Sequence, residues 1–203
     1  MDTLPDDRMP EAEVSLRLAL YIARNQYATG DVDVAIDGAQ VRNLNEIHFP
    51  MDKFIRDEGL IAVTRSGDSW QGVYKIADSQ SKLKIHSSPG LGDVVATLRN
   101  GRRLRVESKK GKLQRSKSSS EYPLLREAIG QLMTVSEVSD IDLLGVAVPH
   151  STKFAELSSR WSSAPLIQRV GIIIICVHRS GLVDGLPAIA ERSNAPESRS
   201  RTF

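Results

Sequence analysis

Residues 89–111, PGLGDVVATLRNGRRLRVESKKG, decide the fold expected for this chain. The stretch holds two short runs of β-favouring residues, 93–98 and 102–107, on either side of Asn100 and Gly101. Asn-Gly between runs rich in branched residues is the strongest short-range signal for a β-hairpin. The sequence therefore predicts two antiparallel strands, with Asp93 at the start of the first and Glu107 at the end of the second.

The length of the turn decides which side chains share a face of this hairpin. Successive side chains of a strand point to opposite faces, so Glu107 and Lys109 face one way and Ser108 the other. A two-residue turn would set Asp93 opposite Ser108, whereas a three-residue loop over 99–101 sets it opposite Glu107. Such loops end in a left-handed residue, a position that suits glycine. If the charged residues act together, we expect the longer loop and a positive φ at Gly101.

An acidic residue leading into a hairpin, followed by Glu-x-Lys on the returning strand, resembles the core of the PD-(D/E)XK nucleases, the restriction-endonuclease-like superfamily. The resemblance implies that Asp93 and Glu107 bind Mg²⁺ or Mn²⁺, with the carbonyl group of Ser108 as a further ligand. Carboxylates are the hard ligands that such cations prefer, and the metal lowers the pKa of the attacking water. Lys109 would orient that water and offset developing charge. Pro89 does not directly precede Asp93, which departs from the motif that names the superfamily.

The implied enzyme is a Mg²⁺-dependent endodeoxyribonuclease that hydrolyses DNA phosphodiester bonds. Charge alone does not mark a polyanion binder, because 27 Lys and Arg residues face 25 Asp and Glu residues, a net charge of +2. The lone Cys176 lies between apolar residues, so we expect a buried thiol and a reducing compartment. The acidic N-terminus lacks signal-peptide features, and no apolar run has membrane-spanning length. A cytoplasmic protein without a membrane partner is expected.

The residues before the hairpin predict a helix over 10–26 and then a mixed α+β region. Strands are expected at 31–37, 60–64, 70–76 and 82–86, with a short helix at 51–59. In parts of the superfamily an N-terminal helix contributes a glutamate, for which Glu13 is the candidate, although acids in a first helical turn also serve the helix dipole. His86 is a candidate proton carrier, although a histidine that ends a strand is commonly a packing residue.

Cations crowd the segment 99–117, in which Glu107 is the only acid. This surface would adjoin the metal site, where a nucleic-acid backbone must run. A solvated basic loop is the plain alternative. The surrounding positive charge is also expected to hold Glu107 ionised. The candidate nucleic-acid-binding residues are Arg102, Arg103, Arg105, Lys110, Lys112, Arg115 and Lys117.

A helix over 121–135, a strand over 143–148, a helix over 152–160 and a strand over 171–177 follow. The two strands should be parallel. This order is the one expected of the nuclease core, and Gln131 matches a helix glutamine that several family members place near the site. The expected fold is α/β (α+β), a restriction-endonuclease-like mixed central sheet flanked by helices. The expected divisions are an α+β region over 1–81, the nuclease-like core over 82–186 and a disordered tail over 187–203. The first region either forms a small accessory layer or extends the nuclease sheet.

Two other functions stay open at this stage. A non-catalytic nucleic-acid-binding or assembly module could keep the fold, but it has no need for clustered charge at Asp93, Glu107 and Lys109. A metal-free structural domain could use the basic loop to meet an acidic partner. A homodimer or a larger defence or repair complex is compatible with the sequence, which fixes neither the pathway nor the cleavage specificity.

Overall fold

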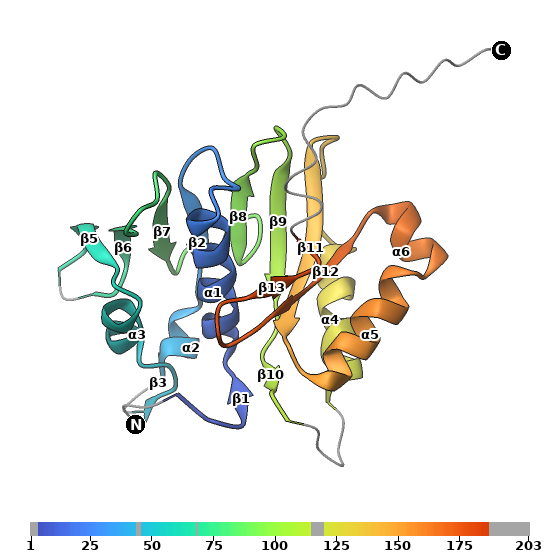
Figure 1. The fold of residues 1–203 in the computed structure, drawn as a ribbon, viewed down its shortest axis with the longest axis horizontal. Coiled ribbons are helices and arrows are strands. Elements are labelled where there is room, and N and C mark those ends of the chain that lie inside the picture. The colour runs from blue at the N-terminus through green and yellow to red at the C-terminus, as the bar shows by residue number, and fades with distance from the viewer. Residues whose placement is uncertain (1–3, 44–45, 68, 115–119, 187–203) are drawn as a thin grey trace.

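The computed structural model describes residues 4–43, 46–67, 69–114 and 120–186 (Figure 1). Within these ranges, nine strands join one mixed sheet in the order β13-β12-β11-β9-β8-β2-β7-β6-β5. In chain order they are β2 Val32–Ala35, β5 Ile61–Arg65, β6 Gly72–Lys75, β7 Lys82–His86, β8 Val94–Thr97, β9 Arg103–Ser108, β11 Asp142–Pro149, β12 Ile173–Val177 and β13 Val183–Asp184. The large mixed sheet that the sequence predicts is confirmed.

The described residues also form six helices and two short strand pairs. The helices are α1 Glu11–Arg24, α2 Gly38–Val41, α3 Met51–Asp57, α4 Glu121–Leu132, α5 Thr152–Ser162 and α6 Pro165–Val170. The strand pairs are β1 Arg8–Met9 with β10 Gly111–Lys112, and β3 Arg42–Asn43 with β4 Glu46–Ile47. None of the described helices is long and apolar enough to cross a membrane.

The hairpin β8–β9 has the register that the three-residue loop predicts. The ladder runs from Thr97 paired with Arg103 to Val94 paired with Val106, so Asp93 lies just beyond its end and close to Glu107. The amide of Leu98 donates to the carbonyl of Arg102 at 2.8 Å and closes the loop. Gly101 has a φ of +80°, the left-handed conformation expected for the last loop residue. The prediction made from turn length is confirmed.

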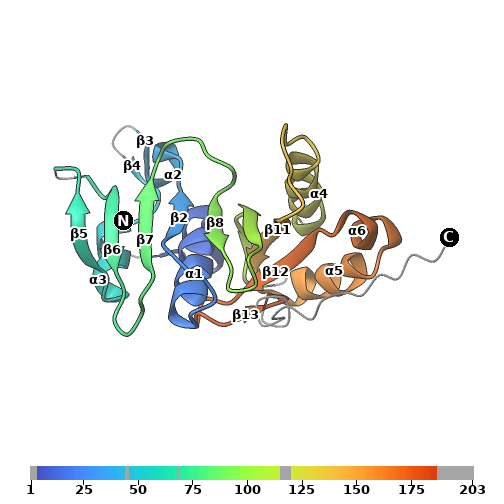
Figure 2. The ribbon, with the colours of Figure 1, turned by 90° about the horizontal axis from the view of Figure 1, so that it is seen from above.

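Helices cover both faces of the sheet (Figure 2). Buried apolar residues of α1 pack with those of β2, β7, β8 and β9 in one core. Apolar residues of α4 and α5 pack with the other side of β11 and β12 in a second core. All eight residues of β11 are buried, as expected for a central strand with neighbours on both faces. Strand β11 runs parallel to both β9 and β12.

The chain before residue 82 shares this sheet. Strand β2 pairs with β7 on one side and with β8 on the other. The first 81 residues therefore supply a strand to the middle of the sheet, next to the predicted hairpin, as well as its far edge. The tail over 187–203, expected to be disordered, lies outside the described residues.

The structure adds short elements that apolar periodicity does not predict. Helix α2 begins after Asp37, whose carboxylate accepts a hydrogen bond from the amide of Ala39 at 2.9 Å and caps the helix. Helix α6 begins at Pro165 and ends at Val170, and the following Gly171 has a φ of +77°. Strand β13 has two residues, too few for a pattern of alternation.

Candidate functional site

The structure brings the residues of the Glu-x-Lys motif to the carboxyl end of β9. The Nζ of Lys109 lies 3.2 Å from Oε1 of Glu107. Asp93 directly precedes the neighbouring strand β8, at the end of its ladder with β9, and its Oδ2 accepts a 2.7 Å hydrogen bond from the amide of Ser108. This bond, together with the electrostatic effect of Glu107 on Asp93, shows that Asp93 lies close to Glu107 and Lys109.

Backbone contacts fix the position of Asp93 before any ligand binds. Its amide donates to the carbonyl of Val106 at 2.8 Å, and its carbonyl accepts from the amide of Ala35 at 2.9 Å. The preceding Gly92 has a φ of +158°, and a Cβ at this position would lie 2.9 Å from the carbonyl oxygen of Val106. Glycine is therefore required for the close approach of the two strands at the site.

The carboxyl group of Asp93 is held in an environment that disfavours its charge. Burial, followed by the negative charge of Glu107, raises the pKa of Asp93 to about 7, although the Ser108 amide acts in the opposite direction. A neighbouring cation would reverse this balance by stabilising both ionised carboxylates. Without a cation the environment favours the protonated carboxyl group of Asp93, and a bound divalent ion would favour the carboxylate.

Burial also raises the pKa of Glu107, and the adjacent Lys109 only partly opposes this effect. The surrounding cations therefore do not lower the pKa of Glu107 overall, and the two arginines of its strand bind Asp142 instead. For Lys109, burial acts to lower the pKa, but the charges of Glu11, Glu107 and Glu127 outweigh it and raise the pKa. The lysine side chain is 6% exposed and stays a cation.

The helix α1 directs a different glutamate toward this group than the one predicted. The side chain of Glu13 is fully buried in ion pairs with Arg17 and Arg179, both at 2.8 Å. Glu11 instead acts electrostatically on Asp93, Glu107 and Lys109. Residues two apart on a helix lie on different faces. The candidate α1 carboxylate is therefore Glu11.

Two of the predicted nucleic-acid-binding arginines serve the fold instead. The guanidinium of Arg103 binds both carboxylate oxygens of Asp142, at 2.6 and 3.0 Å. Arg105 is 4% exposed and binds the same carboxylate at 3.1 Å, together with the carbonyls of Leu91 and Glu137. These contacts make the buried Arg105 a structural residue that joins β9 to β11, and they also engage Arg103, whose side chain remains 33% exposed.

The other predicted cations have varied placements. Arg102 is exposed and donates to the carbonyl of Asp142 at 3.0 Å. Lys110 is exposed next to the site, and Lys112 is half-buried in β10. Arg115 and Lys117 lie outside the described residues.

Helix α4 approaches the site through Glu127, whose Oε1 lies 3.4 Å from Nζ of Lys109. The predicted Gln131, one turn further along, is exposed. Leu125 and Ala128 of α4 are buried. Glu127 stands next to them along the helix, so it lies beside the helix face that packs on the sheet. Both missed glutamates, Glu11 and Glu127, are identified only once the helices are docked.

His86 belongs to a neighbouring charged group two strands away from Asp93. Its ring hydrogen-bonds Asp33, which also accepts from Lys84 at 3.1 Å. The second ring nitrogen of His86, Nδ1, is buried and has no hydrogen-bond partner among the described residues. Strand pairing sets Asp33 and His86 on the same face of the sheet as Asp93.

The donor set fits a hard divalent cation. Asp93 and Glu107 supply two paired carboxylates, and Mg²⁺ is usually bound by one or two carboxylates while it keeps several waters. The fully buried Ser108 directs its side chain away from this face and leaves its backbone at the site. In comparisons with known proteins, no family model, curated protein or solved structure matches this chain.

Proposed function

We propose that this protein is a metal-dependent nuclease that hydrolyses DNA phosphodiester bonds with a core of the restriction-endonuclease-like type. Asp93, Glu107 and the carbonyl of Ser108 would hold Mg²⁺ or Mn²⁺, and Lys109 would orient the attacking water. The observation that carries the proposal is the two neighbouring, half-buried carboxyl groups of Asp93 and Glu107 beside the buried ammonium group of Lys109. The choice of DNA rests on the resemblance of the Asp–hairpin–Glu-x-Lys motif.

The chain's own groups are suited to this reaction. A divalent ion bound here would polarise a phosphoryl oxygen and supply a nucleophilic water at neutral pH. The Ser108 amide fixes one oxygen of Asp93 and leaves the other available. Lys109 is held by Glu107 and Glu127, within reach of negative charge that develops on a phosphate.

An open part of the sheet gives the substrate a route to the site. On the face that carries Asp93, the neighbouring strands present Asp33, Lys84 and His86, whose side chains are 36%, 58% and 17% exposed. We define these three residues as the polar strip. The exposed Lys110 follows β9, directly after Lys109. A phosphate backbone crossing β7, β2 and β8 would pass the carboxylates and reach a cation.

The order of the core elements also supports the proposal. The hairpin β8–β9 is followed by α4, then by β11, α5 and β12, with β9, β11 and β12 parallel. This is the order that the resemblance implies for the nuclease core. It places the carboxyl ends of three neighbouring strands at one edge, where sites in such sheets commonly form.

The test is cleavage of supercoiled plasmid with Mg²⁺ or Mn²⁺ by the full chain and three variants. Asp93→Asn removes one negative ligand but keeps the shape, and we expect no detectable nicking. Lys109→Met keeps the buried volume and removes the charge, and we expect a rate about 10²–10³-fold lower. Lys153→Ala is the matched control, because Lys153 is a half-exposed lysine on α5 that pairs with Glu156, and this variant should cleave like the wild type.

Cleavage that survives Asp93→Asn unchanged would refute the assignment of the site. Metal-independent DNA binding that is unaffected by Asp93→Asn and Lys109→Met, without cleavage by the wild type, would instead support a non-catalytic nucleic-acid-binding module. Binding is therefore measured on the same samples, by gel shift in EDTA.

A further inference from the structure

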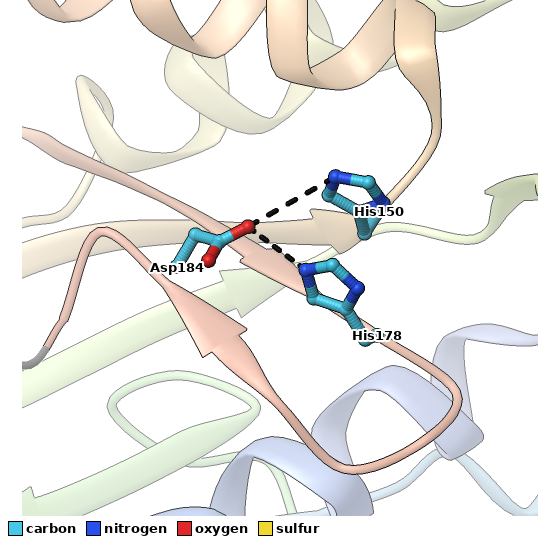
Figure 3. Close-up of side chains that lie close together, drawn as sticks. All are labelled: His150, His178 and Asp184. Atoms are coloured by element: carbon cyan, nitrogen blue, oxygen red, sulfur yellow. Dashed lines mark hydrogen bonds and ion pairs between the residues drawn. The ribbon is translucent and has the colours of Figure 1, made fainter.

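Two histidines and an aspartate converge at a second place on the carboxyl edge of the sheet (Figure 3). His150 follows β11, His178 follows β12 and Asp184 ends β13. Oδ2 of Asp184 lies 2.8 Å from Nε2 of His178 and 4.0 Å from Nε2 of His150. One ligand atom from each residue lies within 4.8 Å of the others. Their sequence positions, 28 and 6 residues apart, give no local metal-binding spacing.

The backbone sets this convergence independently of any ligand. Pro149 pairs with Val177 in the parallel ladder, so the two histidines leave adjacent strands side by side. The amide of His150 donates to the carbonyl of Val177 at 2.7 Å and extends the ladder. The turn from β12 to β13 is closed by Gly181, which has a φ of +92°, and by the amide of His178 bonded to the carbonyl of Leu182 at 2.8 Å.

The two imidazole rings stack face to face beside the carboxylate of Asp184. Their centroids are 3.7 Å apart and their planes differ by 14°. Both rings present Nε2 to the same oxygen, Oδ2 of Asp184, so one nitrogen of each ring is available on the side where the carboxylate lies.

We propose that His150, His178 and Asp184 bind a transition-metal ion of the zinc type, with one coordination position open to solvent. Two imidazole nitrogens and one carboxylate oxygen favour Zn²⁺ and its neighbours in the first transition row over Mg²⁺. This donor chemistry differs from that of Asp93 and Glu107, which offer oxygen alone. The second site therefore selects a different cation from the nuclease site and does not depend on the proposed function.

To complete the site, the two rings tilt out of their parallel stack so that both Nε2 lone pairs point at one ion. Bonds of about 2.0 Å to a tetrahedral ion separate its ligand atoms by about 3.3 Å. The Asp184 side chain is 63% exposed and free to rotate toward the bisector of the two rings. The histidine side chains are 34% and 26% exposed, so water reaches the ion from one side. A bound ion would join the ends of β11, β12 and β13. In the described chain these strands are otherwise joined by the backbone ladders of β12 with β11 and with β13.

The test is calorimetric titration of the full chain with Zn²⁺ after treatment with EDTA and its removal. We use the Asp93→Asn variant as the background, because it weakens the carboxylate site. One Zn²⁺ should bind in this background, and His178→Ala or His150→Ala should weaken it by about 100-fold or more, beyond the roughly 10–100-fold cost of losing a supporting group. His48→Ala, at an exposed histidine elsewhere, is the matched control.

Two further readouts keep the result independent of folding defects. Asp184→Asn retains the shape and should also weaken binding, with an unchanged far-ultraviolet spectrum. Zn²⁺ at 100 times its Kd should raise the Tm by about 5–10 °C in the background variant and not in the His178→Ala double variant. Zn²⁺ affinity that is equal in the His178→Ala, His150→Ala and His48→Ala variants would overturn the proposal, as would Mg²⁺ binding with the same affinity.

Discussion

The most informative single substitution is Asp93→Asn, which should stabilise the metal-free protein at alkaline pH. Burial and the charge of Glu107 raise the pKa of Asp93 from 3.8 to about 7. A carboxyl with a raised pKa in the folded state binds its proton more tightly there than in the unfolded chain. The stability that Asp93 contributes is therefore greatest below pH 3.8 and falls as the pH rises toward about 7.

The size of the effect follows from the shift. A difference of about 3 pKa units corresponds to about 4 kcal/mol at 1.36 kcal/mol per unit, and partial solvation reduces it to roughly 2 kcal/mol. Asparagine avoids this cost because it carries no charge and still accepts the hydrogen bond from the Ser108 amide. We expect Asp93→Asn to raise the free energy of unfolding by about 2 kcal/mol at pH 8, and by much less at pH 4.

The assay is urea unfolding in EDTA, followed by circular dichroism at pH 4 and pH 8. Asp33→Asn is the matched control on the same face of the sheet. Burial of Asp33 is outweighed by hydrogen bonds from His86 and Lys84, which lower its pKa, so its contribution to stability is present above pH 3.8 and lost below it. Asp33→Asn should therefore destabilise the protein at pH 8. A destabilising Asp93→Asn at pH 8, or an equal change at both pH values, would refute the reasoning.

Three other substitutions test the supports of the site. Asp142→Ala should lower the free energy of unfolding by about 3 kcal/mol in urea titrations, because it leaves the buried Arg105 without its carboxylate; a change below 1 kcal/mol would contradict this role. Ser108→Ala should raise the free energy of unfolding by about 1 kcal/mol, since the buried Oγ lacks a hydrogen-bond partner in the described chain. It should leave the Mn²⁺ affinity unchanged, because only the backbone of Ser108 faces the site. Gly101→Ala should lower the free energy of unfolding by about 1–2 kcal/mol because of the φ of +80° alone, since an added Cβ meets nothing within 4 Å. An unchanged Tm would show that the loop tolerates another conformation.

Local sequence features predicted the centre of the fold well. The alternation of the hairpin strands and the need to bring Asp93 opposite Glu107 together required a three-residue loop, and the register and Gly101 agree. The continuous apolar runs around Leu143 and Ile173 predicted two parallel central strands, which the structure has. Strands that are buried on both faces are apolar throughout and show no polar alternation.

The partners of individual charges could not be predicted in this way. Arg103 and Arg105 belong to a dense run of cations, but Asp142, 37 residues after Arg105, takes both into ion pairs once β11 lies beside β9. Similarly, only the docking of α1 onto the sheet distinguishes Glu11 from Glu13, because both stand in the same helical turn. Strand pairing and helix docking between residues far apart in the sequence determine these contacts, so the local sequence pattern cannot predict them.

The same limit explains why the second metal-ligating cluster was missed. His150 and His178 each follow a predicted strand, and the parallel pairing of those strands was expected, so their proximity could have been inferred. Asp184 lies in a two-residue strand that alternation cannot reveal. The complete ligand set therefore required the structure.

The central claim is that Asp93 and Glu107 form a site for a divalent cation. Its most direct test is Mn²⁺ titration followed by electron paramagnetic resonance, without nucleic acid, in a His178→Ala background that removes the competing nitrogen ligands. We expect one Mn²⁺ ion to bind at pH 8, and the additional substitution Asp93→Asn to abolish that binding. Equal Mn²⁺ affinity with aspartate or asparagine at position 93 would contradict the metal site and the nuclease function proposed from it.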